Sequence, residues 1–396
     1  NVSARVGGND WVKGVYYRNF AYYAGVEKKF GDIHRLSLVT FAAPGQRGAQ
    51  NASTQEVYDL TGDNMYNSNW GYQNGKVRNA RVRKTFEPVT ILKYTATPSD
   101  NLEASATVLW RTGKNGYTAM DWYDAADPRP DYYRNLPSYY WMDDPDYGRQ
   151  NAEKAAWAQY AWEENIPEYA HLNWDRLYNV NWNNLDANGM ARSKYVIEER
   201  RVDQNDLNFN ASVKWDATKW FTLTGGLTYK WNRTEYYKKL DDLLGGDYYM
   251  NIDQFAERDF AATPALVQND LDYYLEHGAA QILFQGDKYG YDYYAHVRQG
   301  QLWAMYEISA GGFTANLGGE VGYSTMWREG LWEKGLFLNE NANGNIGLTS
   351  LGDSEHIQNL TYKGKVNLRY QFSGAHSVEA NATIMQNAPT FNNAFV

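Results

Sequence analysis

The sequence predicts an all-β protein, the wall of a transmembrane antiparallel β-barrel, and three observations support this fold class. Ten segments alternate between apolar and polar residues, tight turns join them in five pairs, and long connections rich in aromatic residues separate the pairs. Because successive side chains of a strand point to opposite faces, this alternation gives each strand one apolar and one polar face. Tight turns at one end and long loops at the other are typical of membrane-spanning barrels.

The period-two pattern predicts the strands in order along the chain. In the clearest segment, Val366 and Leu368 fall on one face, while Lys365 and Arg369 fall on the other. The expected strands are 12–30, 35–43, 85–97, 102–112, 193–215, 221–238, 291–308, 313–327, 356–372 and 377–387. We expect one continuous wall in which each strand pairs with its sequence neighbour, without closure into a ten-stranded barrel.

Gly, Pro, Asp and Asn supply the backbone angles that tight turns need, so they mark the connections within each pair. These turns are 31–34, 98–101, 216–219, 311–312 and 373–376. The long connections, expected outside the cell and with short helices in them, are 44–84, 113–192, 239–290 and 329–355. Helices are predicted at 265–277, which follows Thr263 and Pro264 and precedes Gly278, and at 151–164.

The faces of the strands can be assigned by parity. The residues expected to face lipid are Leu223, Leu317, Val366, Leu368, Val378 and Ala380, and a girdle of aromatics close to the short turns comprises Trp215, Phe221, Phe313, Tyr370 and Phe372. The charged residues expected to line the lumen are Glu27, Glu103, Arg111, Glu320, Lys363, Lys365, Arg369 and Glu379. These charges are interpreted in one of two ways: they guide a polar substrate, or they only keep the inner face of the barrel hydrated.

Composition excludes several classes of protein. The 396 residues carry a net charge of −9, which disfavours binding to nucleic acid, and they include no cysteine. No apolar run is long enough for a membrane-spanning helix. The 15 Trp and 34 Tyr exceed ordinary usage and suit interface girdles and loop platforms. The chain opens as if within a loop and closes just after a strand, so we expect a piece of a longer protein.

No catalytic motif is present, so we expect a protein that is not an enzyme and that needs no cofactor. The six histidines are scattered without metal-ligand spacing. The acidic run 142–146 suggests calcium, but it lacks the glycine and the distal glutamate of an EF-hand loop, and a solvated loop tip is the favoured interpretation. No metal site is therefore predicted.

The second long loop holds the best candidate for ligand contact. Its aromatics are Trp122, Tyr132, Tyr133, Tyr139, Tyr140, Trp141, Trp157, Trp162, Trp174 and Trp182. Flat aromatic faces beside polar groups suit sugars, peptides or ring-containing ligands. The cluster chosen for ligand binding is Tyr139, Tyr140, Trp141 and Asp143. The alternative is that these rings pack a core within the loop, which is the favoured interpretation for Trp157 and Trp162.

Four segments resemble those of a known family, in the same order along the chain. They are 41–48 (FAAPGQRG), 69–76 (NWGYQNGK), 121–138 (DWYDAADPRPDYYRNLPS) and 387–395 (NAPTFNNAF). They are similar to segments of Bacteroidetes TonB-dependent outer-membrane receptors, in the subgroup that carries a carboxypeptidase-like regulatory domain.

The resemblance implies that residues 1–396 are part of a TonB-dependent receptor barrel domain: about ten strands of a 22-stranded barrel, with the plug and the remaining strands absent. It implies energy-coupled import of a nutrient (an oligosaccharide, a peptide or a metal chelate) across the outer membrane of a Gram-negative cell. The implied partners are the TonB–ExbB–ExbD complex, membrane lipid and lipopolysaccharide, and the resemblance leaves room for a surface lipoprotein.

Two other functions remain open at this point. An outer-membrane enzyme such as an omptin-like protease fits ten strands, but paired Asp-Asp and Asp-His residues are missing near the loop bases. A surface carbohydrate-binding or adhesion protein fits the aromatic loops, but a lipid-facing girdle counts against it.

Overall fold

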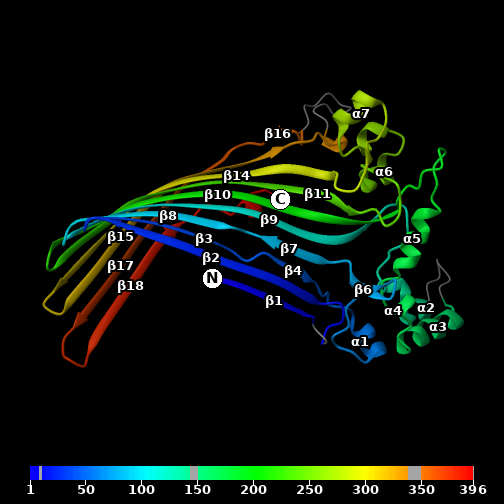
Figure 1. The fold of residues 1–396 in the computed structure, drawn as a ribbon, viewed down its shortest axis with the longest axis horizontal. Helices are drawn as coiled ribbons and strands as arrows, with labels where there is room; N and C mark the ends of the chain where they lie inside the picture. Colours follow the sequence, from blue (N-terminus) through cyan, green and yellow to red (C-terminus); the bar gives the residue numbers. More distant parts are fainter. Residues whose placement is uncertain (9–10, 143–149, 338–348, 396) are drawn as a thin grey trace.

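A single large antiparallel sheet dominates the computed structural model, which describes residues 1–8, 11–142, 150–337 and 349–395 (Figure 1). The sheet runs in the order β1–β2–β3–β8–β9–β10–β11–β14–β15–β17–β18. Its strands are β1 (Val2–Gly8), β2 (Tyr16–Phe30), β3 (His34–Ala42), β8 (Val89–Ser99), β9 (Leu102–Trp122), β10 (Tyr195–Thr218), β11 (Phe221–Asp242), β14 (Lys288–Ala310), β15 (Phe313–Gly330), β17 (Ile357–Gln371) and β18 (Ser377–Gln386). All ten predicted strands are present, and the structure adds β1. Strand β9 continues past the predicted end at residue 112, so residues 113–122, predicted as part of a long loop, belong to the wall.

Two strands of the wall are interrupted by proline. Strand β4 (Gly45–Gly48) continues β3 past Pro44, and β7 (Val82–Phe86) leads into β8 past Pro88. Both β3 and β4 pair with β2, and both β7 and β8 pair with β9. Proline has no N–H to donate to the ladder, so each strand is interrupted at its proline. Little pairing is lost, because the segments on both sides of the proline pair with the same neighbouring strand. The carbonyls of Pro44 and Pro88 still accept hydrogen bonds from the amides of the adjacent strands, at 2.9 and 3.2 Å.

The sheet is an open wall. In the described part of the chain, β1 and β18 do not pair with each other, and every pairing along the wall is antiparallel. The expectation of a continuous wall without closure into a ten-stranded barrel is confirmed. In Figure 1 the short turns gather at one end of the wall and the helical loops at the other.

The register brings the predicted apolar residues to one face. Leu317 lies opposite Val366, Leu368 opposite Ala380, and Leu223 opposite both Trp215 and Tyr306. Residues directly opposite in an antiparallel pair share a face, so the apolar face is continuous across six strands, from β10 to β18. The predicted charged set lies on the other face, where Lys363 Nζ is 3.1 Å from Glu320 Oε1.

Exposed aromatics form two belts on the apolar face. The belt near the short turns contains the predicted Trp215, Phe313 and Tyr370 together with Tyr306, all exposed, and the half-buried Phe221. A second belt, nearer the long loops, contains Trp110, Tyr229 and Tyr323. On β11 the belts are eight residues apart, roughly 26 Å along the strand. Because the strands of membrane barrels tilt by about 35–45°, this spacing corresponds to roughly 20 Å across the membrane, most of an apolar band of about 25 Å.

The long loops fold into short helices and hairpins. The helices are α1 (Gln55–Thr61), α2 (Pro137–Trp141), α3 (Ala152–Glu163), α4 (Pro167–Ala170), α5 (Trp174–Trp182), α6 (Gln254–Phe260), α7 (Leu271–His277) and α8 (Phe391–Ala394), with single turns at η1 (Tyr133–Asn135), η2 (Pro264–Val267) and η3 (Gly335–Phe337). The short strands are β5 (Trp70–Gln73), β6 (Lys76–Asn79), β12 (Tyr249–Met250), β13 (Ile282–Leu283) and β16 (Gly352–Asp353). No helix in the described residues is long and apolar enough to cross a membrane.

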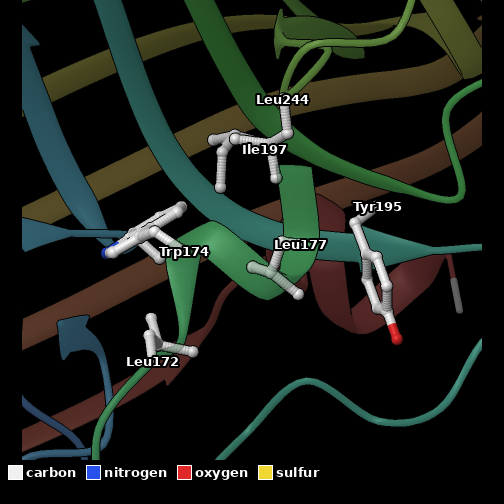
Figure 2. Close-up of a cluster of buried hydrophobic side chains, with 7 residues drawn as sticks. Leu172, Trp174, Leu177, Tyr195, Ile197 and Leu244 are labelled. Carbon is white, nitrogen blue, oxygen red and sulfur yellow. The ribbon is translucent and has the colours of Figure 1, made fainter. Parts of the chain in front are cut away.

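A hydrophobic cluster fixes α5 to the end of the wall. Trp174 and Leu177 of α5 pack with Ile197 of β10 and with Leu244, all of them buried (Figure 2). The helix begins at Asn173, whose side chain accepts a hydrogen bond from the Arg176 amide, as an N-cap does. The loop segment that contains α5 is therefore packed against the end of the wall.

Two details of the loop predictions are corrected. The segment predicted as one helix at 265–277 is a single turn, η2, followed by α7, because the Asp270 side chain caps a new helix. Trp157 was expected in a loop core, but it is 54% exposed, whereas Trp162 is fully buried. On α3 the two lie five residues apart, so they cannot share one face. The predicted helix at 151–164 is confirmed by α3.

Acid should loosen this loop region, because His171 is buried against Trp70, with ring centroids 4.1 Å apart. Burial, with a smaller contribution from Lys13, lowers the pKa of His171 from 6.5 to about 4. Neutral His171 therefore contributes stability that is complete above pH 6.5 and is lost as the pH falls toward 4. Proteolysis within 150–183 should accelerate over this range. His171→Phe should abolish the pH dependence, and His277→Phe should preserve it; equal acid sensitivity in both would contradict the assignment.

Candidate functional site

A cavity of about 640 Å³ lies at the long-loop end of the wall, against its polar face. Strands β9, β10, β11 and β14 contribute Asp121, Arg200, Lys238, Tyr289 and Tyr291. The loops contribute the rest of the cavity, including Asn51, Asn69, Arg81, Arg129, Tyr249, Asp253, Phe255, Asn269 and Lys334. The sheet therefore supplies a rigid floor, and four separate loops supply the rim.

A network of charged groups holds the floor in place. Glu198 is 1% exposed, and its carboxylate lies 2.8 Å from Lys238 Nζ and 2.5 Å from Arg200 Nε. The Tyr289 hydroxyl donates to Asp121 at 2.9 Å or to Glu198 at 3.1 Å. Buried charges are stable only when paired in this way. The network fixes the side chains of Arg200 and Lys238 at the cavity wall.

Gly290 allows this packing. Strand β14 carries two extra residues here, because Tyr237 pairs with Asp292 while Lys238 pairs with Tyr289. Gly290 sits in this bulge with φ +75°, which favours glycine, and its amide donates to Asn251 Oδ1 at 3.0 Å. A Cβ at this position would lie 2.8 Å from Cε of Lys238. The bulge thus directs Tyr291 into the cavity without displacing the lysine.

The rim contributes two further cations. Lys334 Nζ lies 3.5 Å from Asp253, whose side chain also caps α6. Burial lowers the pKa of Lys334, and Asp253 opposes that shift. Arg81 donates to Asn51 Oδ1 at 2.9 Å and stacks over the Tyr117 ring at 5.3 Å. Arg81 forms no ion pair within the described residues.

Charge and shape together favour an anionic ligand. Five cationic side chains line the cavity (Arg81, Arg129, Arg200, Lys238 and Lys334), against two carboxylates (Asp121 and Asp253). Arg129 is paired with Asp127, Arg200 and Lys238 with Glu198, and Lys334 with Asp253, which leaves Arg81 as the lining cation that forms no ion pair within the described residues. A cleft lined mainly by one sign of charge attracts groups of the opposite sign. Tyr249, Tyr291 and Phe255 add flat apolar surface beside them. The cavity can therefore hold an anion with an apolar or ring-containing body.

The aromatic cluster chosen from the sequence lies elsewhere. Tyr139, Tyr140 and Trp141 form α2, where the Tyr139 and Tyr140 rings meet edge to face at 5.3 Å and Trp141 is 53% exposed. Asp143 and the acidic run 143–146 lie outside the described residues. None of the three aromatic residues lines the cavity. The cavity cations were not predicted, although the even numbers of Arg200 and Lys238 agree with the polar face of β10 and β11.

Comparison with known proteins bears on the fold. No protein family and no curated protein matches the sequence. The chain is similar to the open form of the ferric-catecholate import receptor Fiu from E. coli K12, with a TM-score of 0.54 and 10% identity over 98% of this chain and 50% of the receptor. It is also similar to the unliganded ferric citrate transporter FecA, with a TM-score of 0.53 and 8% identity over 96% of this chain and 38% of the transporter. The closed form of Fiu gives a TM-score of 0.50 at 10% identity, over 96% of this chain and 45% of the receptor.

At these identities the likeness concerns the fold alone. The chain spans about half the length of the import receptor that it matches, or less. The transmembrane antiparallel β-barrel fold predicted from the sequence is confirmed, with the chain forming part of such a wall. In this fold the apolar face turns to lipid and the polar face to the lumen. The cavity therefore lies at the lumenal mouth, on the side of the long loops.

Proposed function

We propose that this chain is part of the barrel of a TonB-dependent transporter in the outer membrane of a Gram-negative bacterium. In this proposal the loops capture a nutrient, and the TonB–ExbB–ExbD complex drives its import. Further strands and a plug complete the barrel outside residues 1–396. The proposal rests on the fold, on the resemblance of the four sequence segments, and above all on the cation-lined cavity at the mouth.

The cavity narrows the expected nutrient to one that carries negative charge, such as an acidic metal chelate or an acidic peptide. A neutral oligosaccharide would leave Arg81 without an anionic partner and Lys334 with Asp253 alone. The test is titration of the full-length protein, purified in detergent, with ferric citrate, a hexa-aspartate peptide and neutral maltohexaose. We expect at least one of the two anionic probes to bind and maltohexaose not to bind. Binding of maltohexaose alone would contradict the proposal.

Binding of the anionic probe should weaken as salt is added. The Debye length falls from about 10 Å at 0.1 M salt to about 3 Å at 1 M, so attraction by partly exposed cations is screened. The dissociation constant should rise steadily in titrations between these concentrations. A dissociation constant that is independent of salt would indicate that the cavity charges do not contribute to capture.

We also propose a surface of first contact formed by Tyr139, Tyr140 and Trp141 of α2 together with Asp143, which lies outside the described residues. Trp141→Ala should weaken binding by about 1–3 kcal/mol, the usual range for burying a large apolar side chain, and leave the loop folded. Trp162→Ala is the matched comparison, because Trp162 is buried and donates to the Asn135 carbonyl at 3.0 Å. It should cost the loop about 3–5 kcal/mol and expose it to protease. Unchanged affinity in Trp141→Ala would exclude α2 from the site.

A further inference from the structure

The outward face of α3, a helix in the loop region beyond the wall, carries two large aromatic side chains that are mostly exposed (Figure 1). Trp157 and Tyr160 are 54% and 52% exposed, and their ring centroids lie 5.8 Å apart. The other side of the helix is buried through Ala155, Ala158 and Trp162. Because large apolar side chains exposed together on a folded surface often mark an interaction site, this pair is a candidate contact surface.

A carboxylate lies at each end of the pair. Glu153 precedes Trp157 by four residues, and Glu164 follows Tyr160 by four residues. At 3.6 residues per turn these positions share one face of the helix, which we call the α3 stripe: Glu153, Trp157, Tyr160 and Glu164. All four residues are exposed, and neither carboxylate forms an ion pair within the described part of the chain.

The surroundings of the α3 stripe are negatively charged. The loop segment 121–182 carries twelve carboxylates against five cations, so it accounts for −7 of the net charge of −9. The last turn of α3 contains no basic residue, and the helix dipole places a partial negative charge at this end, beside Glu164. The charge of this loop therefore favours a positively charged partner.

Aromatic rings bordered by carboxylates suit the guanidinium group of arginine. A guanidinium stacks on the face of a Trp or Tyr ring and forms paired hydrogen bonds with a carboxylate. In an extended peptide, alternate side chains lie on one side and roughly 7 Å apart, close to the 5.8 Å between the two ring centroids. The α3 stripe is roughly 16 Å long, which an extended segment of about five residues can span.

We propose that the α3 stripe binds an extended, arginine-rich peptide segment, with guanidinium groups stacked on Trp157 and Tyr160 and others paired with Glu153 and Glu164. The inference goes beyond the proposed function and does not depend on it. The stripe does not line the mouth cavity, and its charge is opposite to that of the cavity cations. Its partner is therefore distinct from an imported anion.

Titration calorimetry of the full-length protein in a non-ionic detergent tests the role of the rings, with hexa-arginine and hexa-lysine as probes. Hexa-arginine should bind more tightly than hexa-lysine, because the planar guanidinium stacks on aromatic rings. Trp157→Ala/Tyr160→Ala should weaken hexa-arginine binding by roughly 5- to 30-fold, the effect of two exposed cation–π contacts. Trp182→Ala is the control, since Trp182 is 56% exposed in the same long loop, and its affinity should match that of the unmodified protein.

A second pair of variants tests the carboxylates. Glu153→Gln/Glu164→Gln should weaken hexa-arginine binding by roughly 3- to 10-fold, as expected for two exposed ion pairs. Glu168→Gln/Asp175→Asn is the matched control, because it removes the same net charge from exposed positions of the same loop. It should bind like the unmodified protein. All these variants should keep the protease resistance of 150–183, because every altered side chain is exposed.

The outcomes separate this proposal from the proposed function. Equal affinity for the two peptides, or equal losses in stripe variants and controls, would indicate attraction by net charge alone and would overturn the proposal. Failure of hexa-arginine to bind the unmodified protein would overturn it as well. Arg81→Gln/Lys334→Gln should leave the affinity for hexa-arginine unchanged while it weakens binding of the anionic probe, so the two sites can fail independently.

Discussion

Replacing Leu227 with arginine should destabilise the protein folded in a membrane by about 2–4 kcal/mol. This is the cost of placing a cation near the middle of a barrel's lipid-facing surface. Leu227 lies opposite Ala211 and Leu302 on the apolar face, between the belts at Phe221 and Tyr229. Leu227 is two residues, roughly 7 Å along the strand, from the belt at Tyr229, so an arginine that extends toward this interface relieves part of the cost, and the lower end of the range is expected. Refolding titrations of the full-length protein into lipid vesicles measure the difference.

Thr228→Arg is the matched control for this experiment. Thr228 is the next residue on β11, opposite Asn210 and Gln301 on the polar face. Its replacement points into the lumen, so its effect should stay within about 0.5 kcal/mol, as for ordinary exposed substitutions. Equal destabilisation by the two variants would show that the faces are assigned wrongly, because a shift of one residue inverts every side chain.

Removing the charges of Arg81 and Lys334 should produce the largest loss of ligand affinity. Each cation can form a charge-assisted hydrogen bond with an anionic group, which contributes about 1.5–3 kcal/mol. Arg81→Gln and Lys334→Gln should therefore each weaken binding of the anionic probe by roughly 10- to 100-fold in titration calorimetry, and the double variant should weaken it further.

Lys76→Gln serves as the control for the cavity, because Lys76 is an exposed cation at the tip of the β5–β6 hairpin and does not line the cavity. Its affinity should match that of the unmodified protein. Equal losses in all three variants would indicate a general effect of net charge. Unchanged affinity in Arg81→Gln and Lys334→Gln would exclude the cavity as the site of capture.

Alternation was sufficient to predict the wall. Segments such as 221–231 keep strict parity between an apolar and a polar face, and that parity fixes both the strand and its orientation. Strand β1 was missed because its seven residues include only two large apolar side chains, Val2 and Val6. The breaks at Pro44 and Pro88 were not foreseen, although proline gives a local reason for each.

The site was less predictable, because it depends on contacts between distant segments. Arg81, Arg200, Lys238 and Lys334 come from different parts of the chain, and no local pattern distinguishes them from other cations. The many aromatic residues of 121–182 favoured a site at α2, but in the folded loop some of these aromatic side chains are buried and others are exposed. Trp162 is buried while Trp157 is exposed, and only tertiary structure decides between them.

Cysteine scanning of β11 tests the central claim most directly, because the chain contains no cysteine that would give background labelling. A fluorophore is placed at each position from 222 to 229 except Gly226, where a Cβ would lie 2.4 Å from the Ala211 carbonyl oxygen, and is quenched from lipid or from water in vesicles that hold the full-length protein. Positions 223, 225, 227 and 229 should respond to a lipid-soluble quencher, and 222, 224 and 228 to an aqueous one. Quenching without this alternation, or with the opposite phase, would contradict a membrane wall with these two faces.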